Sequence, residues 1–168
     1  MPAKIPQEML DAQAEFVSRI DEDWALVTAG TETDGWNTMT IGWGTAGVLW
    51  RRPTLTVFVH PWRYTHGFLL DNDYFTVQLF DSDYKRDLGI LGSRSGRDGD
   101  KVALTRLTPK AIEHGMTFEE ATTTFVCKKI YSHAIDLAVM DADIRAGLGD
   151  FYATEAHTVF VGELVEVL

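Results

Sequence analysis

Residues 37–43 read Asn-Thr-Met-Thr-Ile-Gly-Trp, and this stretch predicts the second strand of a hairpin around which the chain is organised. An apolar run, Trp-Ala-Leu-Val-Thr-Ala at 24–29, precedes it and is typical of a buried strand. Between the two runs, Asp34-Gly35 is a common hairpin-turn pair. The polar groups of residues 37–40 are small, whereas Met39 and Trp43 are large enough to lie against a flat ligand. We therefore expect one side of this hairpin to face a ring system.

Two later stretches combine cations with hydroxyl groups, a combination that suits a phosphate. The first is Pro-Trp-Arg-Tyr-Thr at 61–65, and the second is Gly-Ser-Arg-Ser-Gly-Arg-Asp-Gly-Asp-Lys at 92–101. The planar guanidinium of Arg63 can bind two phosphate oxygens at once. Glycines in the second stretch allow backbone N–H groups to approach an anion closely, and Lys101 adds a positive charge. The ligand predicted by these patterns is a flat, phosphorylated cofactor.

The predicted cofactor contacts divide into a ring set and a phosphate set. Backbone amides of residues 38–40 would serve the edge of the ring. The ring set is Asn37, Thr38, Met39, Thr40 and Trp43, and the phosphate set is Arg63, Tyr64, Thr65, Ser93, Ser95, Gly96 and Lys101.

Each of these residues also has a purely structural interpretation. Arg63 can be a surface cap, and residues 93–99 can be a mobile loop. Met39 and Trp43 can simply fill the core, because large aromatic side chains are most often buried for their area. His157 begins the last strand, where a histidine is often solvated or a cap; it is a weak catalytic candidate, and the catalytic residues stay unassigned.

The composition indicates one globular domain over residues 1–168. Hydrophobic residues make up 45% of the 168 residues, and the formal net charge is -10. Such an acidic chain should be repelled by nucleic acid and by anionic membranes. No apolar run approaches the ~20 residues of a membrane helix, and residues 1–8 lack a signal-peptide core. Cys127 is the only cysteine, which excludes an internal disulfide and favours a cytoplasmic location; a buried, inert thiol is its simplest interpretation.

The remaining pattern favours a mainly β fold, a closed antiparallel barrel with peripheral helices. The segment 44–53 contains two glycines and a proline but also Val48, Leu49 and Trp50, so we expect a loop packed on the core or on a second subunit. The imperfect alternation around Gly162 suggests a bulge or kink. Further strands are expected at 54–60, 74–80, 122–131 and 157–168. Helices are expected at 6–20, 63–71, 82–91 with Ser82 as its cap, and 141–148, with a further turn at 100–107.

Taken in order, four motifs resemble the flavin reductase-like family of FMN-binding split barrels, the flavoredoxin-like proteins. They are Asn37-Thr-Met-Thr40 leading to Trp43, Pro61-x-Arg63-Tyr64-Thr65, Gly92-Ser-x-Ser-Gly96 with Asp100-Lys101, and His157-x-x-Phe-x-Gly-Glu163. The likeness spans residues 24–168. It implies an antiparallel split barrel, a homodimer and one FMN per subunit near the dimer interface.

The resemblance further implies redox chemistry through the flavin, often with NADH or NADPH as the electron donor. A flavin needs no dedicated protein acid or base, because the cofactor performs the difficult step. Three functions remain open: an FMN-dependent NAD(P)H oxidoreductase, a flavoredoxin-type carrier that takes electrons from a protein partner, and a small-molecule binding module without flavin. No metal is predicted, since His60 and His66 lack further ligands at metal-binding spacing.

Overall fold

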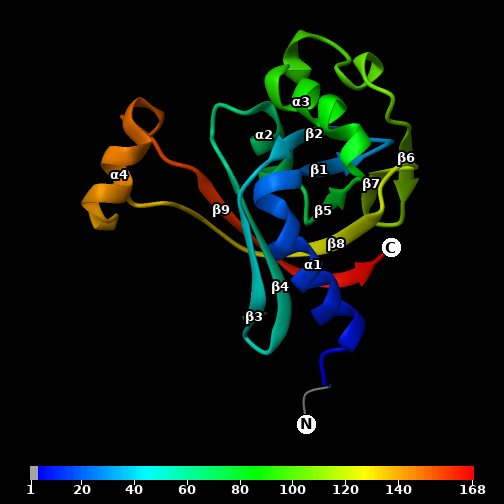
Figure 1. Ribbon diagram of the computed structural model, residues 1–168, viewed down its shortest axis with the longest axis horizontal. Coiled ribbons are helices and arrows are strands. Elements are labelled where there is room, and N and C mark those ends of the chain that lie inside the picture. The colour runs from blue at the N-terminus through cyan, green and yellow to red at the C-terminus, as the bar shows by residue number, and fades with distance from the viewer. Residues whose placement is uncertain (1–3) are drawn as a thin grey trace.

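The computed structural model describes residues 4–168, and its centre is one seven-stranded antiparallel sheet (Figure 1). Residues 1–3 lie outside the described residues. They belong to the stretch 1–8, for which the sequence predicts no signal-peptide core. The strand order is β2-β1-β5-β8-β9-β4-β3, which confirms the expected mainly β, antiparallel class. The strands are β1 Ala25–Thr31, β2 Gly35–Ile41, β3 Gly44–Leu49, β4 Arg52–Val59, β5 Tyr74–Leu79, β8 Thr123–Ala134 and β9 Thr158–Val167, and a separate hairpin joins β6 Pro109–Ile112 to β7 Gly115–Phe118.

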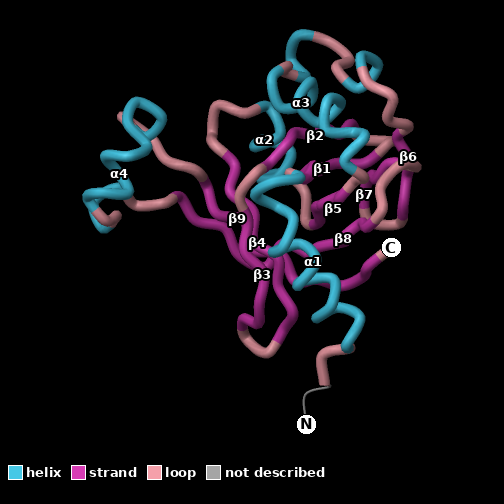
Figure 2. The backbone as a smooth tube through the Cα atoms, viewed as in Figure 1, coloured by secondary structure: helices cyan, strands magenta, loops and turns pink. Residues whose placement is uncertain are grey.

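Helices and short helical turns surround the sheet (Figure 2). The α-helices are α1 Gln7–Asp23, α2 Tyr64–Asp71, α3 Lys85–Ser93 and α4 Ala142–Leu148. The 3-10 turns are η1 Ser82–Tyr84, η2 Gly96–Asp98, η3 Val102–Leu104, η4 Leu137–Val139 and η5 Gly149–Tyr152. Within residues 4–168, no helix combines the length and apolar character needed to cross a membrane.

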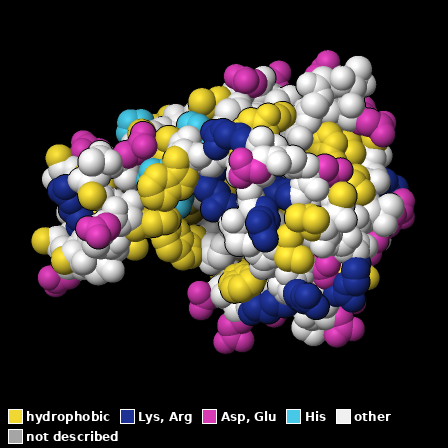
Figure 3. All heavy atoms as spheres, turned by 90° about the horizontal axis from the view of Figure 1, so that it is seen from above, with side chains coloured by type: hydrophobic (Ala, Val, Ile, Leu, Met, Phe, Trp, Pro, Cys, Tyr) yellow, Lys and Arg dark blue, Asp and Glu magenta, His cyan; other side chains and the backbone are white. Residues whose placement is uncertain are grey.

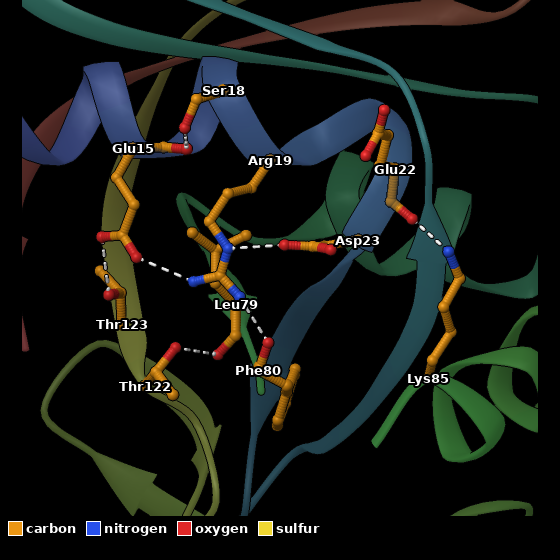
Figure 4. A network of polar contacts seen from close by, with 10 residues as sticks. All are labelled: Glu15, Ser18, Arg19, Glu22, Asp23, Leu79, Phe80, Lys85, Thr122 and Thr123. Carbon is orange, nitrogen blue, oxygen red and sulfur yellow. Dashed lines mark hydrogen bonds and ion pairs between the residues drawn. The ribbon is translucent and has the colours of Figure 1, made fainter. Parts of the chain in front are cut away.

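The helix α1 forms because apolar residues recur every four positions and give it one buried face. Ala12, Phe16 and Ile20 are buried on this face, and the Phe16 ring meets Phe125 of β8 edge to face at 5.7 Å between centroids. Arg19 then fixes the end of the helix by binding Glu15, Asp23 and the carbonyl of Phe80 (Figure 4). Glu15 also accepts a hydrogen bond from the Thr123 hydroxyl at the start of β8, so the helix is held across the ends of β5 and β8.

The segment 44–53 is a strand and a tight turn, so the loop prediction for it is wrong. Residues 44–49 pair with residues 52–57 of β4, and β3 is the last strand at its side of the sheet. Trp50 and Arg51 form the turn with φ values of 50° and 62°, a left-handed conformation that side chains other than glycine seldom adopt. Two glycines weakened the strand signal; only the pairing with β4 makes this segment a strand.

Two further local predictions need correction. Ser82 does not cap α3: residues Ser82–Tyr84 form a 3-10 turn, and α3 begins at Lys85 without a side-chain cap. The β6–β7 hairpin was not predicted at all, because its strands are only four residues each.

The segment between β8 and β9 projects from the body of the molecule. Figure 1 shows α4 standing apart from the sheet, at the far end of the two long strands. Exposed apolar side chains on this segment, hereafter the arm (residues 135–156), include Val139, Ile144 and Phe151.

Candidate functional site

The three stretches singled out in the sequence meet at one cavity of about 210 Å³. It lies where the edge strand β2, the start of α2 and the loop after α3 come together. Residues from all three line it: Asn37, Met39, Trp62, Arg63, Tyr64, Thr65, Gly92, Ser93, Arg94, Ser95, Gly96, Arg97 and Lys101. We refer to it as the cationic cavity.

Arg63, Arg97 and Lys101 bind carbonyl oxygens, and no cation of this cavity has a carboxylate partner within residues 4–168. Arg63 donates to the Gly92 carbonyl at 2.9 Å, and Arg97 donates to the Trp62 carbonyl at 2.9 Å. Burial lowers the pKa of Arg63, and burial together with the charge of Arg63 lowers the pKa of Lys101 to about 8. Partly buried positive charges without counter-charges favour an anionic ligand.

Close packing locks the walls of the cationic cavity together. The Asn37 side chain donates to the Thr65 hydroxyl at 2.8 Å. A Cβ on Gly96 would lie 2.3 Å from the Asn37 Oδ1, so this position admits only glycine without a shift. Ser95 accepts a hydrogen bond from the Arg97 N–H at 3.2 Å and caps η2. Strand, helix and loop are therefore held in one arrangement.

A second cavity of about 230 Å³ adjoins the first and shares Met39, Trp62 and Arg63 with it. Its walls are mostly aromatic: His60 stacks on Trp62 at 4.0 Å between centroids, and Trp62 meets Phe151 edge to face at 5.8 Å. We refer to it as the aromatic cavity. The residues that line it are Met39, Thr40, Ile41, Gly42, Trp43, Phe58, His60, Trp62, Arg63, Phe151 and His157.

Figure 3 shows one face of the molecule on which cationic and hydrophobic side chains lie side by side. There, Lys and Arg side chains gather in the middle of the face, beside hydrophobic side chains along the hollow between the body and the projecting arm. A ligand that spans both cavities would have an anionic group at one end and a flat apolar part at the other. This is the shape predicted from the sequence.

His157 is enclosed, in contrast to a solvated residue at a strand end. Its side chain is 7% exposed, lies 5.1 Å from the Trp43 ring, and its Nδ1 is 2.6 Å from the Tyr152 hydroxyl. Burial, with the neighbouring His60 and Arg63, lowers the pKa of His157 to about 4. The imidazole is therefore neutral at neutral pH and accepts or donates one hydrogen bond at each nitrogen.

Most predicted site residues line one of the two cavities, but Thr38 does not. Its hydroxyl is 2.8 Å from that of Thr28 and donates to the Val27 carbonyl at 3.2 Å, on the side of β1. Thr40 lines the aromatic cavity but donates its hydroxyl to the Leu88 carbonyl at 2.5 Å. Because β2 is the last strand at its side of the sheet, every second backbone group of residues 37–40 points away from β1.

Six residues that line the aromatic cavity were not predicted from the sequence: Ile41, Gly42, Phe58, His60, Trp62 and Phe151. Trp62 lies inside a stretch that was singled out, so its position next to Arg63 was the available signal. Phe151 comes from the arm, and no local pattern links it to the site. Cys127 lines neither cavity; it is fully buried in β8, and burial raises the pKa of its thiol, in agreement with an inert cysteine.

The antiparallel barrel with adjoining cationic and aromatic cavities defines a class of protein that can hold a flat, anionic ligand at the edge of its sheet. The sequence profile of the flavin reductase like domain matches residues 17–168, and the chain belongs to this family. The resemblance noted in the sequence is thus confirmed. A comparison with curated proteins finds no significant match.

Solved structures with a similar fold include several flavoproteins. An FMN-binding protein from Thermus thermophilus, with 1-cyclohex-2-enone bound, is 26% identical, with a TM-score of 0.66 over 86% of this chain and 68% of that one. Flavoredoxin from Methanosarcina acetivorans is 20% identical, with a TM-score of 0.65 over 87% and 67%. The styrene monooxygenase flavin reductase from Pseudomonas putida S12 is 20% identical, with a TM-score of 0.61 over 87% and 78%. At 20% identity, the last two support the fold alone.

Proposed function

We propose that this protein binds FMN and acts as a flavin-dependent oxidoreductase that accepts electrons from NADH or NADPH. The observation that carries the proposal is the junction of the two cavities: Arg63 belongs to both, with uncompensated cations on one side and aromatic side chains on the other. Membership of the flavin reductase-like family supports a flavin as the ligand.

The residues present fit FMN. Arg63, the hydroxyls of Ser93 and Ser95, and the backbone around Gly96 would hold the phosphate. The edge of β2 and the rings of Trp43 and Trp62 would hold the isoalloxazine. The bound flavin would supply the hydride-accepting centre. The chain would position the ring, exclude water with its aromatic walls, and present the neutral imidazole of His157 beside it.

The first test is the loss of the phosphate contact in Arg63→Ala. A charged hydrogen bond contributes roughly 1.5–3 kcal/mol, so the variant should bind FMN more than tenfold more weakly. Riboflavin lacks the phosphate and should bind almost as it does to the unchanged protein. Fluorescence titration of both ligands measures this, with Arg86→Ala on the exposed side of α3 as the control. An equal loss for both ligands would refute the assignment of the cationic cavity to the phosphate.

The second candidate function is a flavoredoxin-type carrier, and the structural likeness to flavoredoxins favours it. One flavoredoxin, from Desulfovibrio vulgaris (Miyazaki F), is 25% identical with a TM-score of 0.63 over 86% of this chain and 68% of that one. A carrier would receive electrons from a protein partner and need no nicotinamide site.

Anaerobic stopped-flow mixing of the FMN-loaded protein with NADH or NADPH separates the two functions. We expect saturable bleaching of the flavin absorbance for a reductase, with only a modest loss in His157→Ala because hydride transfer needs no protein acid. Reduction no faster than that of free FMN would favour the carrier. If the purified protein takes up no flavin, both redox functions are excluded, and the small-molecule binding module without flavin is the remaining function.

A further inference from the structure

Lys101 is a buried lysine whose ammonium group faces carbonyl oxygens. Its side chain is only 5% exposed, and Nζ donates to the Leu91 carbonyl at 2.9 Å and to the Arg94 carbonyl at 3.2 Å. Leu91 lies in the last turn of α3, and Arg94 is the residue that follows the helix. The last carbonyls of a helix have no partner in the helix and carry partial negative charge. Lys101 thus neutralises the end of α3.

The contact with Arg94 also orients the next part of the chain. The carbonyl and the N–H of one peptide unit point in opposite directions, because the unit is planar and trans. With the Arg94 carbonyl turned toward Lys101, the Ser95 N–H is turned away from it. Ser95 lines the cationic cavity, and its N–H makes no hydrogen bond to another group within residues 4–168. This leaves the amide free for a ligand.

The charges around Lys101 come from two elements. Arg63 at the start of α2 is the cation that lowers the pKa of Lys101, in addition to burial. Arg94, Arg97, Asp98 and Asp100 lie on the loop, and Asp100 uses its side chain to cap the backbone of Val102 and Ala103. Lys101 therefore carries its charge without a carboxylate partner.

We propose that Lys101 is a positioning residue for the anion site: through the carbonyls of Leu91 and Arg94 it holds the loop 94–97 so that the Ser95 N–H is available to the ligand. The identity of the anion as the FMN phosphate rests on the proposed function, whereas the ordering of the loop does not. Lys101 acts on the loop in the ligand-free protein, which distinguishes this role from a direct charge contact.

Hydrogen exchange in the ligand-free protein tests the positioning role. We expect the hydrogen-bonded amides of Arg94, Arg97 and Asp98 to exchange at least tenfold faster in Lys101→Met, and far less so in Lys101→Arg, which keeps the charge. Lys85→Met, a cation lost from the other end of the same helix, is the control and should leave these amides unchanged. Loop exchange in Lys101→Met equal to that of the unchanged protein would overturn the proposal. Should the methionine variant not fold, Lys101→Gln decides by the same criterion.

The pH dependence of the preference for FMN over riboflavin gives a second test. A purely structural role of Lys101 would not make this preference depend on pH. The FMN phosphate is fully ionised above pH ~6–7, so its charge is constant from pH 8 to 10. The pKa of Lys101 is lowered to about 8, so the preference for FMN over riboflavin should decline above pH 8 and remain constant in Lys101→Arg. A flat profile in the unchanged protein would contradict the proposal. If the protein binds no flavin, the function proposed above fails, while the hydrogen exchange still decides the role of Lys101.

Discussion

At the scale of single residues, His157 shows how a neighbour changes an expected role. A solvated or capping histidine is common at the start of a strand, yet Tyr152 and Trp43 enclose His157, and its pKa is lowered to about 4 by burial, His60 and Arg63. In the unfolded chain its pKa is ~6.5. Between these values the unfolded state binds a proton that the folded state does not.

This difference in pKa predicts that His157 lowers the free energy of unfolding in acid. Its contribution is fully present above pH 6.5 and is lost as the pH falls toward 4, by an amount on the order of 3 kcal/mol. Urea unfolding at several pH values in this window measures the free energy of unfolding. In His157→Gln the free energy of unfolding should depend less steeply on pH. His133 is an exposed histidine on β8, so His133→Gln should keep the original slope. Identical slopes in all three proteins would show that His157 titrates normally.

Arg63 is the residue on which the two halves of the site depend. It lines both cavities, and its guanidinium binds the Gly92 carbonyl, 29 residues further along the chain. A cation followed by two hydroxyl-bearing residues, Tyr64 and Thr65, was sufficient to nominate it from the sequence. Its partner on the loop could be found only in the fold.

At the scale of elements, the pairing of β8 with β9 depends on Gly162. The register of these strands shifts between Val126 and Cys127 and again between Lys129 and Tyr131, near the position where the sequence suggested a bulge. A Cβ on Gly162 would lie 2.6 Å from both the Cys127 Cβ and the Phe75 ring. The glycine therefore allows a phenylalanine to cover the strand.

Gly162→Ala should destabilise the protein by about 1–3 kcal/mol, the usual cost of overpacking a core. The midpoint of urea unfolding measures this. Gly47→Ala in β3 is a matched control, because nothing lies within 4 Å of its added Cβ, and its effect should stay within about 1 kcal/mol. Equal midpoints for the unchanged protein and Gly162→Ala would mean that β8, β9 and Phe75 rearrange at no cost.

At the scale of the whole molecule, apolar side chains remain exposed on the β3–β4 turn and on the arm. Val48 is 58% exposed and Trp50 is 62% exposed, and on the arm Val139 and Ile144 are exposed as well. Exposed apolar surface that is concentrated in this way usually marks an interface. We therefore expect a homodimer, which the resemblance to the flavin reductase-like family also implies.

Light scattering of the FMN-loaded protein at micromolar concentration should give the mass of two chains. Trp50→Glu should raise the dimer dissociation constant at least tenfold, because a buried charge at an interface is costly. Thr33→Glu, on the exposed turn between β1 and β2, is the control and should leave the mass unchanged. A monomer in the unchanged protein would contradict the expectation.

The sequence by itself determined the features that depend on neighbouring residues. Apolar and β-branched runs, together with a hairpin-turn pair, predicted β1, β2, β4, β5, β8 and β9, and the spacing of Phe16 and Ile20 predicted α1. The stretch 37–43 predicted a flat ligand, and the stretches 61–65 and 92–101 predicted an anionic group because cations and hydroxyls occur together in each of them. Such signals survive in a single chain because helix and strand periods are local properties.

Only the tertiary structure decided which distant residues meet. It made 44–49 a strand through pairing with β4, enclosed His157 with Tyr152 of the arm, and added Phe151 to the aromatic cavity. It also placed the ammonium of Lys101 against the carbonyls that end α3. The physical reason is that the burial of a residue depends on all the elements packed around it. The pKa of a buried group and the partner of its hydrogen bond follow from that packing, and the local sequence does not contain the packed elements.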